Sequence, residues 1–184
     1  MLAVEVLGVE VPDAGRVFFV ALGVHVLAGA TGVVAGALAA FARKRPGRHP
    51  LAGVVYLYGV AVVFATASVM SVLRWEHSWH LFVIAVVAFG AALTGWQVRR
   101  RRPVRWLLWH GVTMAGSYVA LLTGFYVDNG PQLPVWGRLP PVAYWLLPAA
   151  VGVPLTWRAL IRNGAFSRRR RVGPRSGARP RRSG

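Results

Sequence analysis

Cysteine is absent from this 184-residue chain, and acidic residues are scarce, with 5 Asp and Glu against 22 Lys and Arg. The lack of cysteine excludes a disulfide framework, a thiolate zinc site, an iron–sulfur cluster and covalently attached c-type haem. Charged residues make up only 15% of the sequence, compared with about 25% in an average soluble protein. Because 55% of the residues are hydrophobic and the net charge is +17, two classes remain: a membrane protein with basic loops, or a nucleic-acid binder.

Long apolar runs decide between these classes. A helix needs roughly 17–25 mostly apolar residues to cross the hydrocarbon core of a bilayer. Five runs reach that length, at about 17–42, 51–73, 81–98, 104–127 and 139–157. We therefore predict an all-α integral membrane bundle of five transmembrane helices in a domain covering 16–162, after a short external segment at 1–15. The fifth run contains four prolines and is expected to be kinked.

The charges predict the orientation. If the N-terminus is outside, 19 of the 22 Lys and Arg lie on the inner side, and all five acids lie on the outer side. Short cytoplasmic loops carry the Lys/Arg excess in membrane proteins. The sequence thus predicts a multi-pass protein of the plasma membrane, with its N-terminus outside and its C-terminus in the cytoplasm.

The C-terminal segment, 163–184, consists mainly of Arg, Gly, Ser and Pro. Such a segment has too little apolar surface to offset the entropy lost on folding, so we predict a disordered basic cytoplasmic tail. One interpretation is that the tail lies on anionic lipid head groups through Arg168, Arg169, Arg170 and Arg171. The alternative is a solvated tail that only sets the topology. No nucleic-acid partner is expected, since the bilayer is the nearest polyanion.

Side chains that could carry chemistry are few. The chain contains no Gly-x-Ser-x-Gly, His-Glu-x-x-His or phosphate-binding glycine loop. The first four runs have no mid-membrane carboxylate of the kind that proton relays use. The sequence therefore indicates neither hydrolysis nor group transfer, and no catalytic residue is assigned. A redox carrier stays open.

Two histidines lie deep in the predicted helices, each at the head of a stripe of small residues. His25 shares a helix face with Gly29, Gly32 and Gly36, whereas His110 shares one with Thr113, Ser117, Ala120 and Gly124. A stripe of small residues allows either close packing of another helix or close approach of a flat cofactor. The first of these is the more frequent use of such a stripe.

By depth, the histidines form an outer pair, His25 with His80, and an inner pair, His110 with His49. Two imidazoles at similar depth are the ligands of a six-coordinate b-type haem. These four residues are therefore candidate axial ligands for haem b, and no other metal site is predicted. His77 is interpreted as an interface residue.

The motifs around these histidines resemble the bacterial multi-pass membrane proteins of domain-of-unknown-function family 2306. The resemblance covers roughly residues 16–160. It rests on His25 with its glycines, His49-Pro-Leu-Ala-Gly53, His80, His110-Gly-Val-Thr-Met-Ala-Gly-Ser-Tyr118, and Trp-Leu-Leu-Pro148 followed by Gly152 and Pro154. The family implies no established activity. Its histidine pattern is similar to that of four-helix, two-haem b-type cytochromes.

Three functions follow as hypotheses. The first is a membrane electron carrier that holds non-covalent haem and meets a redox partner. The second is a structural or binding membrane protein whose histidines form hydrogen bonds between helices. The third is a transporter for a neutral solute that uses the proline-containing fifth helix.

Overall fold

A computed structural model describes residues 3–6, 9–12, 15–42, 47–134 and 136–166. Five long helices account for most of this part of the chain: α1 (Gly15–Phe41), α2 (Arg48–Leu73), α3 (Trp75–Arg101), α4 (Trp106–Asn129) and α5 (Pro141–Arg162). Two short 3-10 helices, η1 (Gly130–Gln132) and η2 (Trp136–Arg138), connect α4 to α5. The predicted all-α class and the five helices are confirmed.

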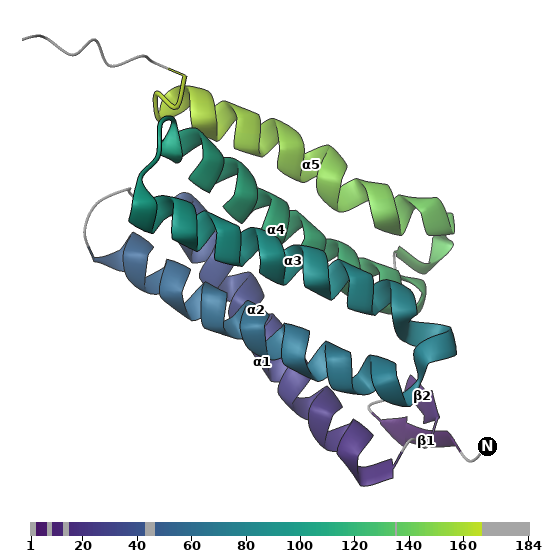
Figure 1. Cartoon of the computed structure of the whole chain (residues 1–184). Coiled ribbons are helices and arrows are strands. Elements are labelled where there is room, and N and C mark those ends of the chain that lie inside the picture. Colours follow the sequence, from purple (N-terminus) through teal and green to yellow (C-terminus); the bar gives the residue numbers. More distant parts are fainter. Residues whose placement is uncertain (1–2, 7–8, 13–14, 43–46, 135, 167–184) are drawn as a thin grey trace, which may run out of the picture.

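Consecutive helices run antiparallel and pack side by side: α1 against α2, α2 against α3, α3 against α4, and α4 against α5 (Figure 1). A further contact between α1 and α4 closes the first four helices into a bundle. In this ring, α1 lies opposite α3, and α2 lies opposite α4. The fifth helix is placed outside the ring, on the surface of α4. Helix α4 thus packs against α3, α5 and α1.

Four of the five helices, α1, α2, α3 and α5, are long and apolar enough to cross a membrane. The fifth predicted span, α4, has 24 residues but is not among them, because histidine, tryptophan, tyrosine and glycine lower its hydropathy. Its position between α3, α5 and α1 gives a physical reason for this composition. A helix that faces other helices on most sides needs less apolar surface for lipid.

Helix α5 keeps its helical assignment across both internal prolines, Pro148 and Pro154. Pro141 opens the helix at its first residues, where the missing N–H has no intrahelical partner to lose. Helix α3 begins earlier than the predicted third span. Only Arg74 separates it from α2, so His77 and His80 belong to the first turns of α3 rather than to a loop.

The core is small and lies among the first four helices. Its buried members come from α1, α2, α3 and α4: Ala35, Tyr56, Val60, Val63, Ala88, Ala92 and Leu121. Many large apolar side chains point outward instead, and Val20, Leu27, Tyr58 and Leu146 are each at least 60% exposed. A surface this apolar is matched to lipid. The chain is therefore a multi-pass helical membrane protein.

The segments 3–6 and 9–12 form a feature that the sequence did not predict. Strands β1 (Ala3–Val6) and β2 (Val9–Pro12) pair antiparallel, in a register that joins Ala3 to Pro12 and Val6 to Val9. The hairpin lies at the end of the bundle where α2 meets α3 (Figure 1). The short N-terminal segment therefore contains regular structure.

Candidate functional site: the histidines of the bundle

His25, on α1, contacts α2 through a side-chain hydrogen bond. Its Nδ1 lies 2.9 Å from Oγ1 of Thr66. The Thr66 hydroxyl donates its only hydrogen to backbone carbonyls of its own helix, at 2.8 Å to Val62 and 3.1 Å to Val63. Nδ1 of His25 must therefore be the donor, which assigns the proton to that nitrogen.

His110, on α4, forms the equivalent bond to α3. Its Nδ1 lies 2.9 Å from the carbonyl oxygen of Gly95. A carbonyl only accepts, so Nδ1 again carries the proton. The bond depends on a glycine at this point of α3, because a Cβ on residue 95 would lie 2.7 Å from Oγ1 of Thr113 and 2.8 Å from Sδ of Met114. Because Gly95 has no side chain, the backbones of α3 and α4 can approach closely, and the Gly95 carbonyl lies within hydrogen-bond distance of His110.

His49 repeats the pattern at the start of α2. Its Nδ1 lies 2.9 Å from the carbonyl oxygen of Ala39 near the end of α1. Three of the four predicted site histidines therefore donate from Nδ1 to a neighbouring helix. In each case the side chain closes a helix–helix contact.

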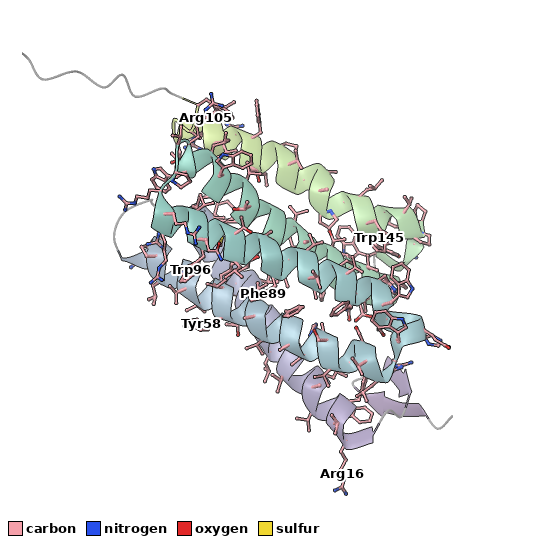
Figure 2. All side chains as sticks on the ribbon, viewed as in Figure 1. Arg16, Tyr58, Phe89, Trp96, Arg105 and Trp145 are labelled. Carbon is pink, nitrogen blue, oxygen red and sulfur yellow. The ribbon has the colours of Figure 1, made fainter. Side chains whose placement is uncertain are left out.

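His80 has different surroundings. Its ring lies 5.9 Å from the ring of Trp79 and 6.2 Å from the ring of Trp145, measured between centroids. Trp145 belongs to α5 and lies near the start of that helix, where it is labelled in Figure 2. His80 therefore contacts the helix outside the four-helix ring. His77, the predicted interface residue, is exposed.

Asp128, near the end of α4, is a charged neighbour that the sequence reading did not assign to these histidines. It interacts electrostatically with His25, His80 and Arg74. These interactions place two histidines, one acid and one arginine, from α1, α3, α4 and the α2–α3 junction, in the same region. The signal in the sequence was weak, because Asp128 follows a long apolar run and reads as an ordinary loop residue.

The predicted pairs can now be compared with this geometry. His25 and His80 lie on α1 and α3, and His49 and His110 lie on α2 and α4, so each pair sits on opposite helices of the ring. The contacts of the outer pair lead in different directions: His25 bonds to α2, whereas His80 meets α5. The structure thus places all four residues but does not test their role as ligands.

The small-residue stripes are filled by neighbouring helices. On α1, a Cβ at Gly32 would lie 3.4 Å from Leu121 of α4, and one at Gly36 would meet the ring of Tyr118 at 2.5 Å. On α4, a Cβ at Gly124 would lie 3.4 Å from Ile84 of α3. A stripe of small residues can accept either another helix or a flat cofactor, and here the stripes are in contact with neighbouring helices.

A buried hydroxyl chain connects three helices, and only Ser117 in it was singled out by sequence. Oγ of Ser117 donates to the carbonyl of Ala88 at 2.7 Å, so the Tyr56 hydroxyl must donate to Ser117, also at 2.7 Å. The next residue, Tyr118, donates to the carbonyl of Val33 on α1 at 3.1 Å. Two adjacent residues of α4 therefore bond to all three other helices of the ring.

The remaining features of the described residues point to no further centre. No group of three or more histidines and acids among them could hold a metal ion. Two open grooves of about 410 and 460 Å³ lie on the surface shared by α1 and α2, around Thr31 and Val55, and neither is lined by a histidine. Arg168 to Arg171, the predicted lipid contacts, lie outside the described residues.

Comparisons with protein-family models, with curated proteins and with solved structures found no match. The resemblance to family 2306 therefore stays a prediction from the motifs. What the fold defines is a class, a multi-pass helical membrane protein, and the function is argued below from its histidines.

Proposed function

We propose that this protein is a structural or binding membrane protein of the plasma membrane, in which histidines act as hydrogen-bond donors that hold the helices together. The observation that carries the proposal is the bond from Nδ1 of His110 to the Gly95 carbonyl, 2.9 Å long. It is supported by the similar bonds of His25 and His49 and by the packing of the glycine stripes.

The physical argument is one of cost. A buried imidazole needs a partner for its N–H, because an unsatisfied donor in hydrocarbon costs several kcal/mol. Each donor here reaches a neighbouring helix, so the bond is available only when the helices are correctly packed. A bond of this kind contributes about 0.6–2 kcal/mol in a membrane protein. Several such bonds specify the arrangement of a bundle that has only a small apolar core.

The experiment compares two substitutions of the same residue. Asparagine places an N–H donor close to the position of Nδ1 but cannot supply Nε2, whereas alanine supplies neither. We expect His110→Ala to lower the unfolding free energy in mixed SDS–detergent micelles by about 1 kcal/mol, and His110→Asn to restore most of the loss. His77→Ala, at an exposed position, is the matched control and should change nothing. Equal losses for the alanine and asparagine variants would contradict the proposal.

Haem binding is the second candidate, and one observation favours it. A histidine that binds a metal through Nε2 usually donates its Nδ1–H to a carbonyl or another acceptor, which orients the ring. His25, His49 and His110 all donate from Nδ1, and the two proposed pairs lie on opposite helices of the ring. A bound haem would supply one-electron transfer across the bilayer.

The fit of a porphyrin is limited by the packing already described. The space between α1 and α4 is occupied by Tyr118 and Leu121, which approach Gly36 and Gly32, and Tyr56 fills the core beside them. Haem therefore requires the helices to separate. The same variants distinguish the candidates, because His110→Asn would keep its stability but lose a b-type absorption band if His110 binds iron. Transport of a neutral solute stays a prediction from the sequence.

A further inference from the structure

Arginines gather at one end of the bundle. In the described part of the chain this end carries exposed or partly exposed residues from α2, from α3 and its connection to α4, and from the end of α5: Arg48, Arg99, Arg100, Arg101, Arg102, Arg105, Arg158 and Arg162. The described acids belong to other places. Glu76 and Asp128 lie at the opposite ends of α3 and α4, and Glu5 and Glu10 lie in the hairpin at that same opposite end. Among the described residues, the arginine-rich end therefore carries no acid.

The connection between α3 and α4 has a defined shape. Arg102 and Arg105 both adopt left-handed backbone conformations, with φ of 46° and 60°. Such conformations are uncommon for residues other than glycine and are held by the structure around them. Two arginine–tryptophan contacts flank this connection: the Arg100 guanidinium lies 4.3 Å from the centre of the Trp96 ring, and that of Arg102 lies 5.6 Å from the centre of the Trp106 ring.

The end of α5 adjoins this connection. Leu160 packs onto Gly111 of α4, where an added Cβ would lie 2.6 Å from the leucine side chain. Figure 2 shows Arg105 beside the same end of α5. Arg158 and Arg162 lie two residues before and after Leu160, so they project from the side of α5 that faces away from α4. The α3–α4 connection and the last turn of α5 thus both carry arginines at the same end of the bundle, but on different faces.

We propose that the α3–α4 connection, Arg99–Arg105, is a binding site for the phosphate of an anionic phospholipid. Arginine is suited to phosphate because its planar group donates two parallel hydrogen bonds. Tryptophan rings at the ends of membrane helices lie at the level of the head groups, so Trp96 and Trp106 set the arginines at lipid phosphate height. The site is separate from the tail at 163–184, which the sequence nominated for lipid.

The test uses full-length protein in vesicles that contain phosphatidylcholine and phosphatidylglycerol, with bromine on the acyl chains of one lipid at a time. Bromine quenches nearby tryptophans, so the ratio of quenching by the two lipids reports selectivity. We expect brominated phosphatidylglycerol to quench more strongly, and the excess to fall as salt rises. The variant Arg102→Gln/Arg105→Gln should bind the anionic lipid about fivefold more weakly for each arginine lost, which is the effect expected of one basic residue at a membrane surface.

Three controls locate the site. Arg16→Gln/Arg138→Gln removes the same charge from exposed positions at the other end and should keep the selectivity. Arg102→Lys/Arg105→Lys keeps the charge but loses the paired hydrogen bonds, so its selectivity should lie between those of the wild type and the glutamine variant. Substitution of Arg168 to Arg171 by glutamine tests the tail. The proposal is overturned if the wild type shows no selectivity, if only the tail variant loses it, or if both ends contribute equally.

Discussion

The hydroxyl of Tyr56 donates a hydrogen bond to Oγ of Ser117 at 2.7 Å, and both side chains are almost completely buried. Ser117 in turn donates to the carbonyl of Ala88. The two bonds connect α2, α4 and α3 at one level, where no water is available to replace them. This pair explains how a bundle with few large buried side chains can have a single arrangement.

The first prediction concerns this pair. Tyr56→Phe and Ser117→Ala should each lower the unfolding free energy by about 1–2 kcal/mol, because each removes one partner and leaves the other group buried. The double variant should lose less than the sum of the two single losses, which marks a direct interaction. Tyr58→Phe, on an exposed tyrosine of the same helix, should have no effect. Strict additivity would mean that the bond contributes nothing.

The second prediction tests the close approach of α3 and α4. Gly95→Ala adds a methyl group that would meet Thr113 and Met114, so we expect a loss of about 1–3 kcal/mol from overpacking. Gly90→Ala, in the same helix with nothing within 4 Å of the new Cβ, should be neutral or slightly stabilising. If both variants behave alike in a thermal unfolding assay, the contact through Gly95 is not formed.

The third prediction concerns topology, which depends on whether α4 and α5 both cross the membrane. A reporter placed after Arg171 should be read on the cytoplasmic side, and one inserted at Gln132, between α4 and α5, should be read outside, because 19 of 22 basic residues then lie within the cell. If the Arg171 and Gln132 reporters lie on the same side, α5 does not span. That result would leave a protein of four crossings.

The fourth prediction is that the C-terminal segment contributes nothing to folding. Removal of Arg168 to Gly184 should leave the midpoint of thermal unfolding unchanged, since this stretch has no apolar face to pack on the bundle. The measurement is differential scanning fluorimetry of the purified full-length and shortened chains. A large drop in the midpoint would show that the segment packs against the helices.

The sequence predicted the helices well because lipid imposes a simple requirement. A long apolar run bounded by charged residues has few alternatives to a helix, so α1, α2 and α4 begin and end close to the predicted limits, whereas α5 continues to Arg162. The start of α3 was missed because Glu76 and His77 looked like a loop, yet a helix can continue past the apolar region into the head groups. The apolar character of α4 was overestimated, because a run without charges can still contain histidine, tryptophan and tyrosine, which lower its hydropathy.

The partners of the histidines were less accessible to sequence analysis. Spacing along α1 placed His25 on the stripe with Gly29 and Gly32, which is correct for one helix. It could not show that the opposite position on α2 would carry Thr66, because that depends on the register between helices. Asp128 was assigned to the outside and to no site for the same reason. Sequence periodicity predicts which residues share a face of one helix. A site formed between two helices also depends on how those helices are aligned, which periodicity does not give.

The visible absorption spectrum of the full-length protein, purified from membranes of cells supplied with haem, tests the central proposal most directly. If the histidines serve as hydrogen-bond donors between helices, the reduced-minus-oxidised spectrum should contain no b-type band at a level stoichiometric with the protein. A stoichiometric band that disappears in His25→Ala and His110→Ala but persists in His77→Ala would contradict the structural role and establish haem ligation.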